Sequence, residues 1–113
     1  MQNQETTEIL ILTVDAEVGR KVRFLGTVYG VSCLSRSLVK DMVANLQNWT
    51  IGGELKTYSV MMNQGLALIM ERLKEQARAV GADAIYGVRF TTTSIAQGAA
   101  ELIGYGTAVK YVD

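Results

Sequence analysis

The feature that most constrains the fold is a long amphipathic stretch that ends at a glycine. Its apolar side chains recur at three- and four-residue spacing as one continuous stripe: Met62, Leu66, Ile69, Leu73, Ala77 and Val80. This is the period of a helix with one buried face, so it predicts a helix from about Thr57 to Val80. Gly81 follows at the position where a helix C-terminus favours a left-handed residue. We therefore expect Gly81 to end this helix.

Two strands are predicted near the N-terminus. The run EILILTV, Glu8 to Val14, is rich in leucine and β-branched residues, and VRFLGTVYGV, Val22 to Val31, alternates. The turn residues DAEVG, Asp15 to Gly19, lie between them, so the pattern predicts a hairpin. Alternation would place one set of side chains of the second strand on a common face: Val22, Phe24, Gly26, Val28 and Gly30.

Another helix is predicted between these strands and the long helix. In SRSLVKDMVANLQNW, Ser35 to Trp49, apolar residues recur at helical spacing, and Ser35 is the candidate N-cap. The segment TIGGELK, Thr50 to Lys56, then breaks the pattern. Its paired glycines, Gly52 and Gly53, allow backbone angles that are closed to other residues, so we expect a loop there.

Two more strands are predicted after Gly81. Alternation from Ala84 to Thr93 would place four side chains on one face: Ala84, Tyr86, Val88 and Phe90. After the small residues of IAQGAA, the last strand is predicted from Leu102 to Val112, with Gly104, Gly106 and Ala108 sharing a face. A helix can lie close over a sheet at such small residues, so these positions predict close packing.

The predicted order is therefore β-β-α-α-β-β, with an antiparallel hairpin at each end. We expect an α+β fold in which one antiparallel sheet carries two helices on one face. The 113 residues fit a single domain, residues 1–113. So few strands leave edges with unpaired N–H and C=O groups, and pairing of edges between the subunits of a ring is one way to cover them.

Composition narrows the classes of partner. The chain is 49% hydrophobic and only 19% charged, which favours burial of part of its surface against other subunits. Its 11 basic and 11 acidic residues cancel, so no net field attracts nucleic acid or an anionic membrane. No signal peptide is recognisable, no apolar run approaches a membrane span, and there is a single cysteine. We therefore expect a cytoplasmic protein without nucleic-acid or membrane partners.

The residue types exclude several chemistries. The sequence has no histidine, which removes the commonest general base and the imidazole metal ligands. Cys33 is the one candidate thiolate for a metal, although a lone cysteine is more often a small buried hydrophobe. One chain therefore supplies too few soft ligands for a heavy metal. The symmetry of a ring could bring copies of Cys33, or of the Met61–Met62 pair, together.

A candidate ligand site groups around the paired glycines. Gly52 and Gly53 precede a helix start, where backbone N–H groups bind anions. Four polar side chains could line a cleft beside this loop: Arg36, Lys40, Asp41 and Tyr58. The plainer alternatives are an ordinary loop and a surface helix with solvated charges. Neither GxGxxG nor a Walker sequence occurs, so the glycines do not form a known phosphate motif.

An ordered set of short motifs along the chain resembles the YbjQ-like family, small bacterial proteins labelled as heavy-metal-binding. The motifs are Gly26-Thr27-Val28-Tyr29-Gly30, Lys40-Asp41, Gly52-Gly53 before Tyr58, the run from Glu75 to Ala84 that contains Gly81-Ala82-Asp83, Gly87-Val88, and Gly106-Thr107-Ala108-Val109. They cover the chain from about Gly19 to Val109. One departure is Gly65-Leu66, where the family tends to have an Ala-Arg pair.

The resemblance implies a dodecin-like α+β subunit that assembles into a homopentameric ring, with sheets and short strands joined across interfaces. The family supplies no catalytic residues. Our leading hypothesis is a cytoplasmic, non-enzymatic homo-oligomer that binds a small ligand or partner at subunit interfaces. A second hypothesis is a metal-binding protein whose ligands are repeated by symmetry. A third is an enzyme without histidine that uses Arg36, Asp41 and Tyr58 in a cleft closed by the glycine loop.

Overall fold

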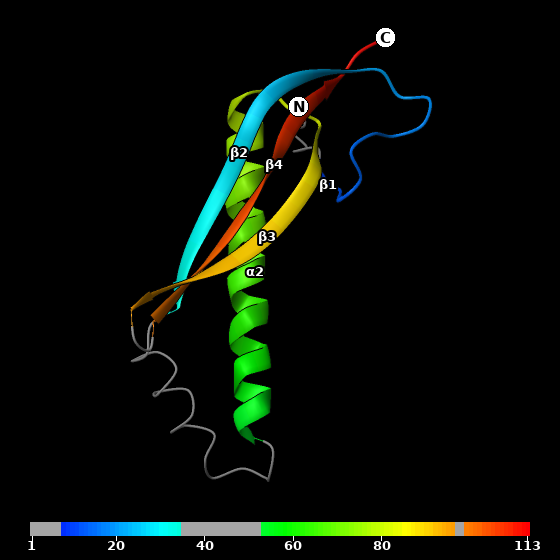
Figure 1. Ribbon diagram of the computed structural model, residues 1–113. Coiled ribbons are helices and arrows are strands. Elements are labelled where there is room, and N and C mark those ends of the chain that lie inside the picture. The colour runs from blue at the N-terminus through cyan, green and yellow to red at the C-terminus, as the bar shows by residue number, and fades with distance from the viewer. Residues whose placement is uncertain (1–7, 35–52, 97–98) are drawn as a thin grey trace, which may run out of the picture.

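The computed structural model describes residues 8–34, 53–96 and 99–113, which form one helix on one face of a four-stranded sheet (Figure 1). In chain order the elements are β1 (Leu10–Ile11), β2 (Val22–Leu34), α2 (Gly53–Ala79), β3 (Ala84–Ala96) and β4 (Ala99–Tyr111). The strands lie in the order β1-β3-β4-β2. Because β1 runs parallel to β3 while β4 runs antiparallel to both β3 and β2, the sheet is mixed.

The predicted fold class is wrong in its helices and in its first hairpin, although the fold is consistent with the α+β class. The described residues contain one helix where two were predicted, and their order is β-β-α-β-β. The segment predicted as the first helix, residues 35–49, lies outside the described residues. β1 and β2 do not pair, because they lie at opposite edges of the sheet. The connection 12–21 can span up to about 33 Å, whereas crossing the sheet takes only about 14 Å, so the chain needs no tight turn there.

The end of α2 confirms the predicted role of Gly81. Its φ of 78° is left-handed. The N–H of Gly81 donates to the carbonyl of Arg78 at 3.0 Å, and the N–H of Ala82 donates to the carbonyl of Ala77 at 2.9 Å. These two bonds form a Schellman motif, which satisfies carbonyls that a helix end leaves free. The Asp83 carboxylate then accepts the backbone N–H of Tyr111 at 2.8 Å, which ties the turn to β4.

Small residues of the sheet let α2 approach closely. Ile69, Leu73 and Ala77 of the helix are fully buried. A Cβ atom added at Gly104 would lie 2.5 Å from Cγ2 of Ile69, and one added at Gly30 would lie 3.3 Å from the Ile69 carbonyl oxygen. Real Cβ atoms do not come as close as 2.5 Å to another heavy atom. The predicted close packing over glycine is therefore confirmed, and the core lies between α2 and this face.

A bulge in β3 turns side chains to the opposite face. The strand register shifts between Tyr86 and Arg89, around Gly87 with its φ of 63°. As a result, Ala84 and Tyr86 pack together in one cluster, while Val88 lies in the core under α2. The predicted common face of these side chains is wrong, because an extra residue in one strand breaks the two-residue alternation.

β2 carries a second bulge with the same effect. Its register shifts between Phe24 and Gly26, which has a φ of 123°. Val22 packs with the cluster that contains Tyr86, whereas Val28 lies in the core under α2. The predicted common face of Val22 and Val28 is therefore also wrong. Past this bulge the side chains of β2 alternate regularly. The core positions, such as Val28, face the helix, and the residues between them point away from it.

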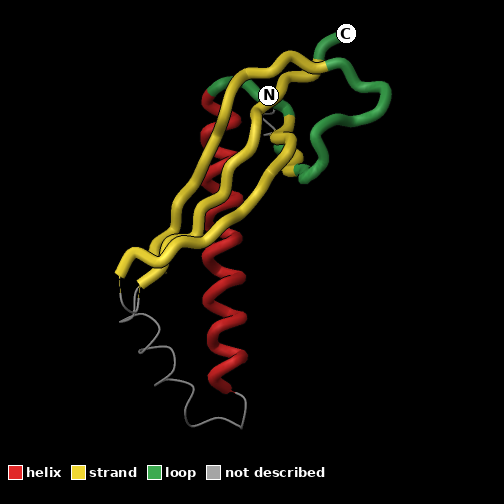
Figure 2. The backbone as a smooth tube through the Cα atoms, viewed as in Figure 1, coloured by secondary structure: helices red, strands yellow, loops and turns green. Residues whose placement is uncertain are grey.

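The two faces of the sheet differ in what covers them. α2 lies along one face of the sheet, and we name the opposite face the outer face (Figure 2). The connection from β1 to β2 loops out beside one end of the sheet (Figure 2). The first turns of α2 extend past the ends of β3 and β4 (Figure 1). In the part of the chain that the structure describes, no helix is long and apolar enough to cross a membrane.

Candidate functional site

The predicted ligand residues fall mostly where the structure gives no description. Arg36, Lys40, Asp41 and Gly52 lie outside the described residues. Gly53 begins α2, and Tyr58 belongs to the second turn of that helix, but the Tyr58 side chain also lies outside what the structure describes. The ligand site around the paired glycines, and with it the enzyme hypothesis, therefore stays a prediction.

The described residues bring a different set of side chains together, on the outer face. Tyr29 of β2 and Tyr105 of β4 are paired across the two strands, and Val31 and Ile103 form the next pair on this face. Tyr29 is 60% exposed and Tyr105 is 43% exposed, whereas Val31 and Ile103 are half-buried. We name these four residues the outer-face patch. Side by side, these large aromatic and β-branched side chains form an apolar surface. The hydroxyl groups of the two tyrosines stand at the outer ends of their rings.

The outer-face patch has a polar rim with a positive and a negative end. Arg89 of β3 is the strand partner of Tyr105. Two pairs further along β4, Glu101 is the partner of both Cys33 in β2 and Thr93 in β3. The Thr93 hydroxyl donates to the Glu101 carboxylate at 3.3 Å. The centre of the patch is therefore free of charge, and its charged groups stand at its ends.

Cys33 is exposed, so the prediction that it is a small buried hydrophobe is wrong. It lies on the outer face beside Glu101, which gives one thiol and one carboxylate at the same place. Among the described residues, no three acidic or cysteine side chains lie close enough together to hold a metal ion. Cys33 and Glu101 can thus supply two ligands from one chain, half of what a tetrahedral metal needs.

The free edge of β2 is occupied by side chains of the helix. The Gln76 side chain accepts the backbone N–H of Tyr29 at 3.0 Å and donates to the carbonyl of Tyr29 at 2.6 Å. The Arg72 guanidinium donates to the carbonyl of Val31. The unpaired backbone groups of a strand edge can bond to another strand. In the middle of β2 these groups are already bonded to the side chains of Gln76 and Arg72.

A polar cluster holds the connection 12–21 onto one end of the outer face. The Glu17 carboxylate accepts hydrogen bonds from the hydroxyls of Tyr86 at 2.7 Å and Tyr111 at 3.0 Å. These bonds, with Arg20 nearby, lower the pKa of Glu17. Burial, reinforced by the bond to Glu17, raises the pKa of Tyr86 to about 12. The Arg20 guanidinium lies 3.8 Å from the centre of the Tyr111 ring as a cation–π contact.

Sequence reasoning missed this cluster, because it treated residues 15–19 only as turn residues. One signal was present: Tyr111 stands two residues after Val109, on the face that alternation predicts to be opposite Gly104 and Ala108. A tyrosine buried against a sheet needs a hydrogen-bond partner for its hydroxyl. The sequence does not show that Glu17 supplies this partner, because the contact depends on the path of a connection that crosses the sheet.

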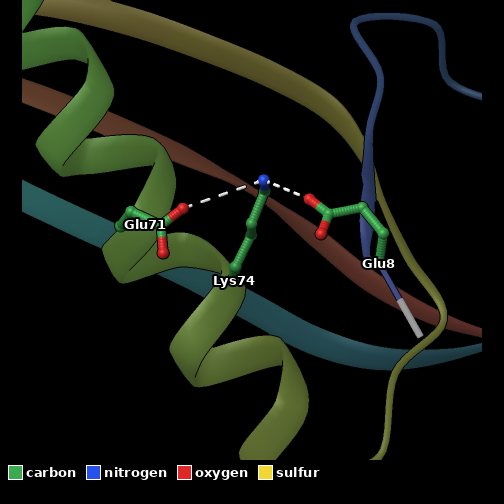
Figure 3. Close-up of polar contacts among 3 residues, drawn as sticks. All are labelled: Glu8, Glu71 and Lys74. Carbon is green, nitrogen blue, oxygen red and sulfur yellow. Dashed lines mark hydrogen bonds and ion pairs between the residues drawn. The ribbon is translucent and has the colours of Figure 1, made fainter. Parts of the chain in front are cut away.

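A second polar contact ties the segment before β1 to the helix (Figure 3). The Lys74 ammonium of α2 lies 2.5 Å from the carboxylate of Glu8 and 3.8 Å from that of Glu71. The hydrogen bond and charge of Lys74 lower the pKa of Glu8. Both carboxylates are largely exposed, so solvent screens these ion pairs and they position the segment more than they stabilise the fold.

The solvent side of α2 also carries exposed apolar residues. Val60 is 40% exposed and Leu68 is 43% exposed, with the exposed Ala67 between them in the sequence. Spacings of seven and eight residues return to one side of a helix, so the three lie along one strip. We name Val60, Ala67 and Leu68 the helix strip. Glu71 continues the same side toward the C-terminus, one turn beyond Leu68.

Comparison with known proteins shows the family. The family model of the YbjQ proteins, described as "Putative heavy-metal-binding", matches residues 9–112. A UPF0145 protein of Thermus thermophilus is 43% identical over 104 residues, which cover 91% of this chain and 90% of that protein. A UPF0145 protein of Clostridium novyi is 39% identical over 102 residues, which cover 90% of this chain and 98% of that protein.

A solved structure has the same fold. It is a protein of unknown function from Pediococcus pentosaceus, assigned to the DUF74 family, with a TM-score of 0.65 and 18% identity over 92% of this chain and 98% of that chain. At that identity the likeness concerns the fold alone. The family match over most of the chain and the identities near 40% carry the assignment: the chain belongs to the YbjQ-like family of UPF0145 proteins.

Proposed function

We propose that this protein is a cytoplasmic, non-enzymatic subunit that assembles with copies of itself into a closed ring, a pentamer, and that it binds a small ligand or partner where subunits meet. The observation that carries the proposal is the set of large apolar side chains that the described residues leave exposed. On the sheet, Phe24 is 64% exposed, Tyr29 60% and Tyr105 43%, and on α2 Leu68 is 43% exposed. Exposed apolar side chains in such number are typical of surfaces that contact another protein.

The positions of these side chains suit a ring. Each subunit of a ring takes part in two interfaces, and the exposed apolar residues lie both on the sheet and on the helix. Exposed aromatic residues such as Tyr29 and Phe24 are of the kind that interfaces use, and the zero net charge places no repulsion between copies.

Native mass spectrometry and sedimentation at micromolar concentration test the assembly. We expect a single species whose mass is a small multiple of 12.3 kDa, five chains for a pentamer. The same spectra, taken without added ligand or metal, report any small molecule that is retained. A monomer at micromolar concentration would refute the proposal, because the exposed surface would then have no partner.

Metal binding is the second candidate, and Cys33 beside Glu101 is the observation that favours it, together with the description of the family. One chain supplies a thiol and a carboxylate, and a neighbouring copy can supply the rest. Calorimetry with Zn²⁺ tests it: binding should disappear in Cys33→Ser and persist in Val18→Ser, a change at an exposed residue in the connection 12–21. Unchanged Zn²⁺ binding by Cys33→Ser would exclude a thiolate site.

A further inference from the structure

The outer-face patch and the helix strip lie on opposite sides of the molecule, and each is apolar and exposed. The patch residues lie between the core positions of β2 and β4, on the face of the sheet away from α2. The strip residues are exposed on α2, whereas Ile69, Leu73 and Ala77 of the same helix are buried in the core. We propose that these two surfaces meet: the outer-face patch of one copy packs on the helix strip of the next copy. This inference rests on the proposed self-assembly and names the two halves of its contact.

A contact between two different surfaces explains why both are exposed. If each surface packed only on the same surface of another copy, patch on patch and strip on strip, two separate two-fold contacts would be needed. The copies would then form a chain or a larger assembly of dimers. A head-to-tail contact covers both surfaces with one interface, and its repetition closes a ring when the rotation between copies allows it. Each copy then covers both of its exposed apolar surfaces.

The chemistry of the two surfaces is complementary. The patch offers two tyrosine rings and two aliphatic side chains without a charge among them, which is the composition of an interface core. Leu68 and Val60 offer aliphatic side chains of a size to pack on those rings. Arg89 stands beside Tyr105 at the rim of the patch, and Glu71 stands one turn from Leu68. Both side chains are more than half exposed, but each already has a partner in its own chain: Arg89 donates to the carbonyl of Thr13 at 2.8 Å, and Glu71 lies 3.8 Å from Lys74. The apolar side chains, and not an ion pair, therefore carry the contact.

The main alternative, pairing of β2 edges between copies, is disfavoured by the described contacts. Both backbone groups of Tyr29 and the carbonyl of Val31 are already bonded by Gln76 and Arg72 of the same chain. An incoming strand would have to displace these bonds in the middle of β2 before it gained its own. The broad outer face of the sheet needs no backbone groups, so a contact there leaves these bonds on β2 intact.

Two charged substitutions test the contact, because each breaks one half of it. Tyr105→Lys places a charge in the patch and leaves the helix strip intact, and Leu68→Lys does the reverse. We expect each variant alone to lose the ring and run with the mass of one chain, 12.3 kDa. In a 1:1 mixture, the intact patch of Leu68→Lys can bind the intact strip of Tyr105→Lys. The mixture should therefore form a heterodimer of twice the chain mass and no larger species.

A matched control and three readings make the outcome decisive. Val18→Lys puts the same charge on an apolar side chain that is fully exposed in the connection 12–21, outside both surfaces, and should keep the wild-type mass. Circular dichroism confirms that each variant is folded. A monomeric wild type would overturn the proposed function itself. An oligomeric wild type whose Tyr105→Lys and Leu68→Lys variants keep its mass, or whose variants are monomeric but form no dimer on mixing, would overturn this contact and leave the self-assembly intact.

Discussion

Adding one methyl group at Gly104 is expected to destabilise the fold, because that methyl has no room. A Cβ at Gly104 would lie 2.5 Å from Cγ2 of the fully buried Ile69 and 2.9 Å from the ring of Phe90. Phe90 is 38% exposed, so its ring can swing outward, but Ile69 is enclosed by the core. Overpacking of this kind costs about 1–3 kcal/mol, so Gly104→Ala should lower the free energy of unfolding by that amount.

A second substitution identifies the atom responsible. Leucine in place of Ile69 keeps the volume and removes the methyl branch at Cβ, which is the Cγ2 atom that Gly104→Ala would strike. Ile69→Leu alone should cost less than about 1.5 kcal/mol. In the double variant, the cost of Gly104→Ala should shrink by at least about 0.5 kcal/mol, since the two sites are in direct contact.

Gly106 provides the matched control. A Cβ there would lie 2.8 Å from Cγ2 of Ile85 and 2.9 Å from Cγ2 of Val88, so Gly106→Ala should also destabilise, but Ile69→Leu should not relieve it. Urea denaturation at one fixed protein concentration measures all variants, because assembly contributes to the apparent stability. If Gly104→Ala unfolds at the wild-type urea concentration, or if Ile69→Leu rescues Gly106→Ala equally well, the packing argument is wrong.

Three further predictions follow from described contacts. Gly81→Val should lose about 1–2 kcal/mol in urea denaturation, because its φ of 78° penalises any Cβ, and Gly81→Asn should lose less; equal stability of all three would disprove the left-handed turn. The lowered pKa of Glu17 means that its contribution is present above about pH 4.5 and disappears as pH falls through the lowered pKa, so Glu17→Gln should be less stable than wild type at about pH 7 and equally stable at about pH 2. The pKa of Tyr86, raised from 10.0 to about 12, means that its contribution is complete below pH 10 and is lost as pH rises through about 12; ultraviolet titration of tyrosinate should show a step near 12 that is absent in Tyr86→Phe.

Local patterns predicted the parts of the fold that are local. The stripe from Met62 to Ala77 gave the helix, Gly81 gave its end, and the hairpin of β3 and β4 joins strands that are neighbours in the sequence. The small residues on β4 also predicted the close approach of the helix, because a missing Cβ is visible in the sequence itself.

The wrong predictions concern places where a single residue, or a single contact between distant parts of the sequence, determines the fold. Gly87 breaks the alternation of β3, and nothing in the pattern distinguishes a glycine that forms a bulge from one that leaves space for a helix. β1 pairs with β3, in the register of Leu10 with Ala84, so its place depends on residues far along the chain. The outer-face patch consists of alternate residues of β2 and β4, and its exposure could not be predicted without knowing which face the helix covers.

The central position of β4 has a consequence for synthesis of the chain. β2 touches the sheet only through β4, and the two strands are separated in the sequence by roughly 65 residues, which a ribosome needs about 3–13 seconds to add. During that interval β2, with Val28, Tyr29 and Val31, has no neighbouring strand to pair with. Gln76 and Arg72 are translated before β4. The side chains of the helix can therefore bond to one edge of β2 before β4 is made. The bonds from Gln76 to Tyr29 cover the edge of β2 in the folded molecule, and both of their partners are synthesised before β4.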